Sequence, residues 1–562
     1  MANDTADRIV FGNVITMDDA APRAEAVAIR AGRVLAAGKR DAVLALKGGE
    51  TRVDDFGSAT VIPGFNDTHA HSDSQGLKTI RPSLSEARSV EDVLKRISEL
   101  AKTQAPGTWI ATMPVGEPPF YFDGAQKLAE GRLPTREELD KAAPNHPVYI
   151  AAPGGYWGVP PCTCVLNSAA LSANGITRDS QPVWPNITIH RDGSGEPNGQ
   201  ITEKAYVTLT EQDLLPAVPR FTYAERLEGV RRALPLYHAR GTTSIYEGHG
   251  MGPEAIACFR ELHEKGELTM RSGLVISPTW ASAADAEPIM RDYLAYARGN
   301  GTGDDMLRIA GVFIAYGGDK VIRDVMQRDV TDVGFSGFVK SVNAPDEFEA
   351  LCELAGRYDL RMNTIVSDKL HEIVPILERV AKKYPIGKRR WVLEHVSRSS
   401  QSDLERVKKL GVAVTLIPPH YVWKVAGPFM NMTDEELDYL SPARALHELG
   451  AEVSAGTDAV PNDPLFCLWV MTTRRERTTG RIMGKNGRID NALGLRLLTT
   501  AGAYLTFEEN VKGPLKPGYY ADLAVLSGDP IAAKGDDILN IRCEATMVGG
   551  RWVYGEKAAG RA

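Results

Sequence analysis

Short apolar runs alternate with amphipathic segments along the chain from residue 242 onwards. Seven runs are typical of buried strands, and each is followed by a segment with the 3.6-residue period of a helix; the runs cover residues 242–246, 272–276, 309–314, 360–365, 390–395, 412–417 and 453–456. This alternation predicts parallel strands joined by crossover helices. We therefore expect an α/β fold built on a (β/α)8 TIM barrel, with its site at the carboxyl ends of the strands.

The two ends of the chain have a different pattern. Residues 8–62 and 511–554 each contain short strand-like runs separated by turns, which indicates two halves of one small β domain. We expect this composite domain to comprise residues 1–64 and 508–562, and the barrel to comprise residues 65–74 and 226–507. Residues 75–225 interrupt the barrel pattern after its first strand, so they are predicted to form an inserted α/β subdomain over the active site.

Residues 61–73, VIPGFNDTHAHSD, place two histidines two positions apart at the expected end of an apolar strand. Because successive side chains of a strand alternate between faces, the imidazoles of His69 and His71 are predicted to point to one side. Nitrogen ligands at about 2.0–2.1 Å suit a divalent cation, and a strand end leaves room for water and substrate. Without further context the pair is equally explained as two surface histidines.

Further candidate ligands follow later strands. His395 ends one predicted strand, His420 follows the next, and Asp458 ends another in the phrase GTDAVPNDPL. Since the carboxyl ends of parallel strands meet at one face of a barrel, we expect these side chains to join the first two histidines there. A single histidine at a strand end is usually structural. Several such residues converging from different strands favour a metal hydrolase.

The phrase VIPGFNDTHAH resembles the hPGhIDxHxH signature of the amidohydrolase superfamily. Longer phrases, including VLNSAALSANGI, EPNGQITE and GTDAVPNDPL, resemble its YtcJ-like (amidohydrolase 3) branch over nearly the whole chain. The resemblance implies a β-sandwich formed by both chain ends beside the barrel. It also implies that His69, His71 and Asp458 form a first metal site and that Asp458 is the general base. His395 and His420 match two further histidines of the branch, which would stabilise a developing oxyanion.

Two positions depart from this resemblance. Phe313 stands where the branch has a lysine whose carbamate would bridge two cations, and Thr364 stands where it has a histidine. Two divalent ions about 3.5–4 Å apart repel strongly without a bridging anion. We therefore expect one divalent ion per chain rather than two, bound by the first-site residues together with His395. Zn²⁺ is the expected ion, with Mn²⁺ and Fe²⁺ as alternatives.

Three other residues are candidates for an additional ligand. Glu247 and His249 follow the strand at 242–246 and can face the pocket; the alternative is a loop carboxylate and a solvent-exposed histidine. Glu203 in GQITEK matches a carboxylate of a family phrase, and its role is either metal binding or structural.

Substrate contacts are expected from aromatic residues on both walls of the site. Tyr156 and Trp157 lie in the insertion and Trp423 follows the seventh strand, so they are predicted to clamp an aromatic or cyclic substrate. The alternative is that they pack the insertion against the barrel. Phe313 and Thr364 are expected to line the same pocket.

The resemblance implies cleavage of an amide-type C–N bond by metal-activated water, in an N-substituted formamide, an acyl amide or a cyclic amide. Two alternatives remain open. A metal-dependent decarboxylase on the same barrel would need no bridging lysine, and a degenerate binding protein would have lost catalysis. The retained histidines and Asp458 argue against the second alternative.

Composition narrows the class of protein. The chain has 562 residues, of which 43% are apolar and 24% charged, and its formal charge is −7. No run of lysines and arginines stands out in the chain, so nucleic acid and anionic membranes are not expected as partners. The expected partner is a small-molecule substrate. The start of the chain lacks a signal-peptide pattern, and six scattered cysteines form no disulfide framework, so a reducing cytoplasmic location is expected. A homodimer is the expected assembly.

Overall fold

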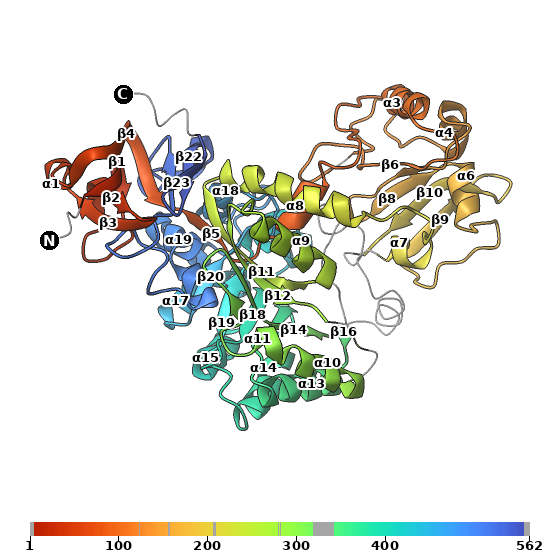
Figure 1. Cartoon of the computed structure of the whole chain (residues 1–562). Coiled ribbons are helices and arrows are strands. Elements are labelled where there is room, and N and C mark those ends of the chain that lie inside the picture. The colour runs from red at the N-terminus through yellow and green to blue at the C-terminus, as the bar shows by residue number, and fades with distance from the viewer. Residues whose placement is uncertain are drawn as a thin grey trace. The chain divides into compact units, whose positions relative to one another are not determined.

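The structure is a computed structural model that describes residues 5–122, 124–154, 158–205, 209–278, 280, 283–317 and 342–555 (Figure 1). The chain divides into two compact units. The first contains Met1–Ser72, Arg231–Gly317 and Asn343–Ala562, and the second contains Asp73–Val230.

Eight parallel strands of the first unit form a nearly closed barrel, which confirms the predicted fold class. Each strand is hydrogen-bonded to the next in the order β5-β11-β12-β14-β17-β18-β19-β20. Their bounds are β5 (Phe65–Asp67), β11 (Thr242–Met251), β12 (Arg271–Ile276), β14 (Leu307–Phe313), β17 (Met362–Ser367), β18 (Val392–Val396), β19 (Ala413–Leu416) and β20 (Val453–Ala455).

The seam between the first and last barrel strands is joined by residues just beyond their carboxyl ends. The Asp458 N–H donates to the His69 carbonyl over 2.8 Å. The Thr457 N–H donates to the Asp67 carboxylate, also over 2.8 Å. Because these bonds tie the two strand ends together, they bring Asp458 beside the two histidines that follow β5.

Helices follow the barrel strands and lie outside them (Figure 1). They are α9 (Pro253–Glu264), α10 (Ala283–Asp292), α13 (Pro345–Arg357), α14 (Leu370–Ala381), α15 (Gln401–Leu410), α17 (Ala443–Glu448), α18 (Pro464–Thr473) and α19 (Asn491–Leu498). In α15 the Ser400 hydroxyl caps the first turn, and Gly411 with φ 68° ends the helix. None of the helices in the described ranges is long and apolar enough to cross a bilayer.

Both ends of the chain contribute to one seven-stranded sheet. Its order is β23-β22-β21-β4-β1-β2-β3. The bounds are β1 (Ala6–Ile15), β2 (Arg23–Arg30), β3 (Arg33–Gly38), β4 (Lys47–Pro63), β21 (Leu523–Leu526), β22 (Cys543–Val548) and β23 (Arg551–Tyr554). Val61 pairs with Val525, and both side chains join one buried apolar cluster. The chain then enters the barrel at Gly64, where a Cβ would lie 2.2 Å from the Thr243 side chain.

The second unit is built on a five-stranded sheet of order β6-β7-β8-β10-β9. Its strands are β6 (Ile110–Thr112), β7 (Val148–Ile150), β8 (Cys162–Leu166), β9 (Ile187–Arg191) and β10 (Pro197–Glu203). Helices α3 (Val90–Thr103), α4 (Arg136–Ala142) and α6 (Ser168–Ala173) belong to the same unit. This region therefore has the α/β composition expected of the insertion.

His238 ends α8 (Tyr223–His238) and is buried. Its Nδ1 donates to the Thr242 carbonyl over 3.0 Å, and its Nε2 lies 2.9 Å from the Thr269 hydroxyl. Burial lowers the pKa of His238 to about 4. An unfolded histidine titrates near 6.5, so between these values the unfolded chain binds a proton that the folded chain does not. Stability contributed by neutral His238 is therefore lost as the pH falls from about 6.5 to 4.

We expect this proton to lower the free energy of unfolding by up to about 3 kcal/mol at pH 4 relative to pH 7. A His238→Asn variant, which keeps a donor near the Thr242 carbonyl, should remove that part of the pH dependence. Urea unfolding between pH 4 and 7 measures it, with the exposed His371→Gln variant as control. An equal pH slope in wild type and His238→Asn contradicts the prediction.

Candidate metal centre

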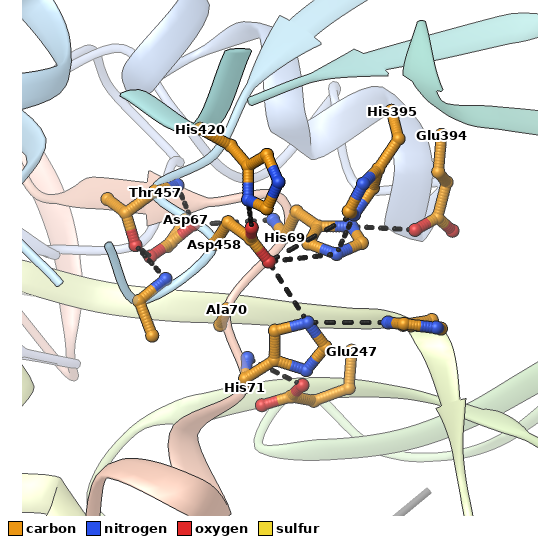
Figure 2. Close-up of polar contacts among 12 residues, drawn as sticks. Asp67, His69, Ala70, His71, Glu247, Glu394, His395, His420, Thr457 and Asp458 are labelled. Atoms are coloured by element: carbon orange, nitrogen blue, oxygen red, sulfur yellow. Dashed lines mark hydrogen bonds and ion pairs between the residues drawn. The ribbon is translucent and has the colours of Figure 1, made fainter. Parts of the chain in front are cut away.

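Side chains from three strand ends of the barrel meet in one cluster (Figure 2). His69 and His71 follow β5, His395 lies in β18 and Asp458 follows β20. His69 Nε2 lies 2.7 Å from His395 Nε2 and 3.6 Å from Asp458 Oδ1. His71 Nε2 lies 3.1 Å from the same carboxylate oxygen. The structure thus brings together the four residues that the sequence nominates as ligands.

Backbone turns, rather than strand alternation, produce this convergence. Strand β5 ends at Asp67, before both histidines. His71, His395 and Asp458 have φ values of 64°, 57° and 56°, a region that few non-glycine residues adopt and that is concentrated at functional sites. The two imidazoles do lie close together, as predicted. The predicted reason is wrong, because His69 and His71 follow the strand and do not share one of its faces.

Glu247 holds the turn after the first histidine. Its carboxylate accepts the N–H groups of His71 and Ser72 over 2.9 and 2.8 Å, and it also accepts the Ser72 hydroxyl. Both oxygens are thus engaged by the chain at this turn. Glu247 positions His71 in this structure and does not present a carboxylate oxygen alongside the four nominated ligands.

Glu394 is a site residue that the sequence reasoning missed. It is fully buried, and its Oε2 lies 2.7 Å from His69 Nδ1 (Figure 2). A carboxylate at this nitrogen favours the tautomer with a proton on Nδ1, which leaves the Nε2 lone pair directed at the cluster. The positive φ of His395 breaks strand alternation, so that neighbouring residues 394 and 395 both reach the site.

Electrostatics keep His395 and Asp458 in forms that bind cations, whereas at His69 the contact with Glu394 outweighs burial and raises the pKa, so a cation that binds there displaces a proton. Burial, reinforced by the His69 charge, holds the pKa of His395 well below its usual value, so its imidazole is neutral. Burial alone would raise the pKa of Asp458. Hydrogen bonds from His420 and His71 outweigh that effect and hold the pKa well below its ordinary range. His420 Nδ1 lies 2.7 Å from Asp458 Oδ2, which leaves Oδ1 facing the histidine nitrogens.

This donor set fits a divalent cation. His69 Nε2 and His395 Nε2 lie 2.7 Å apart, so without a cation one of the two nitrogens carries the proton that joins them, and a cation bound by both lone pairs would take the place of that proton. A tetrahedral shell with bonds of about 2.0–2.1 Å has ligand separations of roughly 3.4 Å. The Asp458 Oδ1 distances of 3.1, 3.6 and 4.0 Å to the three imidazole nitrogens bracket that value. Imidazole nitrogen with carboxylate oxygen is also the ligand chemistry of zinc, manganese and iron sites.

The remaining predicted residues have varied positions. His249 joins the cluster, with Nδ1 3.4 Å from His71 Nε2. Phe313 is buried with its ring centroid 5.2 Å from that of His249, and Thr364 is fully buried in β17. Trp423 packs edge-on against Phe466 of α18, with centroids 4.9 Å apart, so this contact lies within the first unit; the expected role of Trp423 in substrate binding stays a prediction.

Glu203 lies in the second unit, where its carboxylate accepts the N–H groups of Leu209 and Thr210 over 2.8 and 3.1 Å. These bonds give Glu203 a structural role at the start of α7 (Thr210–Asp213). The predicted substrate residues Tyr156 and Trp157 lie outside the described residues.

Asp67 is a second buried carboxylate that the sequence reasoning did not single out. It accepts hydrogen bonds from the backbone N–H and hydroxyl of Thr457, and burial raises its pKa to about 6. Since Thr457 directly precedes Asp458, this pair fixes the loop that carries the ligand carboxylate. The Tyr421 hydroxyl also reaches the cluster and lies 3.3 Å from His395 Nδ1.

We expect a Glu394→Gln variant to bind metal about 10–100-fold more weakly than wild type, because an amide does not hold the His69 tautomer as a carboxylate does. Competition with a chromogenic chelator measures the dissociation constant. The exposed Glu448→Gln variant is the control. Equal affinities for wild type and Glu394→Gln would exclude this role.

Comparison with known proteins places the chain in a family. A model of the amidohydrolase family, Amidohydro_3, matches residues 53–554, and the chain belongs to that family. It is 24% identical to YtcJ of Bacillus subtilis, over 97% of this chain and 98% of that protein. It is also 24% identical to the N-substituted formamide deformylase of Arthrobacter pascens, over 96% and 97% of the two chains.

A solved structure of a metal-dependent hydrolase from Pyrococcus horikoshii shares the fold. It superposes with a TM-score of 0.66 at 21% identity, covering 94% of this chain and 99% of that one. An adenosine deaminase from Xanthomonas campestris, solved with bound zinc, superposes with a TM-score of 0.54 at 14% identity, covering 99% and 95%. These superpositions show the shared fold, and the family match confirms the amidohydrolase resemblance expected from the sequence.

Proposed function

We propose that this protein is a metal-dependent hydrolase that cleaves the C–N bond of an amide, with N-substituted formamides as the leading substrate class. The convergence of three imidazole nitrogens on Asp458 Oδ1 carries this proposal. Membership of the amidohydrolase family supports it. The end-to-end similarity to a protein called N-substituted formamide deformylase favours the formamide class among amides.

One divalent ion, with zinc preferred and manganese or iron as alternatives, would be held by His69, His71, His395 and Asp458. Such an ion supplies Lewis-acid activation of water near neutral pH. A single ion is favoured over two because Phe313 cannot form a bridging carbamate and Thr364 offers no nitrogen.

The protein's own groups supply proton transfer and orientation. Asp458 is ionised and directs one oxygen at the imidazole nitrogens, so it can accept a proton from water and pass it to the leaving nitrogen. His420 binds the other oxygen and fixes the carboxylate rotamer. A substrate carbonyl beside His395 or His420 would receive a hydrogen bond as negative charge develops, and losing one such donor typically slows catalysis by about 10²–10³-fold.

Product analysis in ¹⁸O-labelled water tests the proposal. The protein, loaded with one equivalent of Zn²⁺, Mn²⁺ or Fe²⁺, is incubated with formanilide, acetanilide, a lactam and an aromatic carboxylic acid. We expect equal amounts of amine and formate from formanilide, label in the formate, and loss of activity on chelation. Release of CO₂ and the decarboxylated arene from the acid, with no amide cleaved, would instead establish the decarboxylase alternative. Elemental analysis of protein loaded with excess metal and then desalted counts the bound ions, and two tightly bound ions per chain would overturn the single-ion assignment.

A further inference from the structure

His249 occupies a place at the centre that the four nominated ligands do not explain. It lies in β11 and is 5% exposed. Its Nδ1 is 3.4 Å from His71 Nε2, close to the ligand separation of a tetrahedral shell with bonds of about 2.0–2.1 Å. One ring nitrogen from each of His69, His249 and His395 lies within 4.8 Å of the other two. This second group of three shares His69 with the group formed by His69, His71 and Asp458.

The backbone on either side of His249 is pressed against the barrel interior. At Gly248 a Cβ would lie 2.1 Å from a Glu394 carboxylate oxygen. Gly250 has φ 82°, and a Cβ there would lie 2.6 Å from the Phe313 Cβ. Neither position accepts a side chain without movement of its neighbours. The two glycines therefore let this segment approach the centre closely with a single side chain, the imidazole of His249.

Phe313 packs against that imidazole. The ring centroids are 5.2 Å apart at an interplanar angle of 56°, and Phe313 is 3% exposed. A phenylalanine cannot bind a cation here, but it restricts the rotation of the imidazole beside it. Thr364 is fully buried and provides no nitrogen donor. The two departures from the family pattern thus accompany an imidazole that reaches the same centre from a different strand.

We propose that His249 is a ligand of the metal centre and that Phe313 is its positioning residue. Loss of the nitrogen donor at position 364 is then offset by a donor from β11, and the phenylalanine at position 313 directs that donor inward. The inference rests on the proposed function only in requiring that a divalent cation binds at this centre. It makes no demand on the identity of the substrate.

Cobalt binding to metal-free protein tests the assignment without any assay of activity. Co²⁺ is titrated into wild type and into His249→Gln, Phe313→Leu and His371→Gln, the last being an exposed histidine. We expect His249→Gln to weaken Co²⁺ binding at least 10-fold. Loss of a hydrogen-bond partner of a ligand typically weakens metal binding about 10–100-fold, and loss of a ligand itself should cost at least as much. Phe313→Leu should weaken binding several-fold, and His371→Gln should match wild type.

A His249→Cys variant gives a direct spectroscopic signature. If position 249 binds the ion, Co²⁺ should produce a thiolate-to-metal charge-transfer band in the near ultraviolet that wild type lacks. This variant retains a ligand, so it also covers the case in which His249→Gln does not fold, which circular dichroism detects. Co²⁺ bound to folded His249→Cys without that band would overturn the proposal.

The outcomes separate this inference from the proposed function. Failure of wild type to bind Co²⁺ or Zn²⁺ removes the metal centre, and both proposals fail. Wild-type affinity in folded His249→Gln removes only His249 from the ligand set and leaves the four-residue centre intact.

Discussion

An Asp458→Asn variant is expected to lose amide hydrolysis by about 10²–10⁴-fold in kcat/KM while keeping the fold and most of its metal, the range typical of a general acid–base group. Asparagine has the size of aspartate, and its carbonyl oxygen can occupy the place of Oδ1, 3.1 Å from His71 Nε2. It cannot accept the water proton at neutral pH. Its amide group would also face His420 Nδ1, where Oδ2 now lies 2.7 Å away.

Rates and metal content must be measured on the same samples. Loss of activity with metal retained assigns Asp458 to proton transfer, whereas loss of both assigns it to metal binding alone. Asp434→Asn, at an exposed position, is the control for removing a carboxylate. Near-normal kcat/KM in Asp458→Asn with a full metal complement would exclude Asp458 as the base.

The barrel could be predicted because each of its strands and helices leaves a pattern in a short stretch of sequence. Each strand is a short apolar run followed by an amphipathic helix, and every run predicted from residue 242 onwards overlaps a barrel strand. The candidate ligands His69, His71, His395 and Asp458 could be nominated because strand ends and the family phrase single them out. The barrel brings the strand ends to one face, and the positive-φ turns at three of these residues complete the convergence.

The residues that were missed depend on contacts that no local pattern contains. Glu394 reaches His69 only because residue 395 leaves the extended conformation, with φ 57°. Asp67 accepts a hydrogen bond from Thr457 across the seam between the first and last strands, and the two residues are 390 positions apart in the chain. The carboxylate of Glu247 is engaged by a turn whose geometry the sequence does not reveal. Backbone conformation and cross-barrel register therefore decided which carboxylates face the metal centre and which support it.

A buried ion pair joins the barrel to the sheet that both chain ends form, and breaking it should have a large effect on stability. Arg271, at the start of β12, contacts Asp522 just before β21, with Nε 2.6 Å from Oδ2. Their side chains are 4% and 7% exposed. The Asp522 carboxylate also accepts the Gly549 N–H over 2.8 Å. We expect Arg271→Met to lower the free energy of unfolding by about 3–5 kcal/mol, since it leaves a buried carboxylate without its cation.

The double variant Arg271→Met/Asp522→Asn identifies the cause. Asparagine keeps an acceptor for the Gly549 N–H and removes the uncompensated charge, so the double variant should recover much of the stability lost by Arg271→Met. Arg298→Met is the control, because Arg298 is 66% exposed in its pair with Asp359 and should contribute at most about 1 kcal/mol. Urea unfolding of all four variants, including Asp522→Asn alone, completes the cycle. Strictly additive losses would show that the two side chains do not stabilise each other and would contradict the prediction.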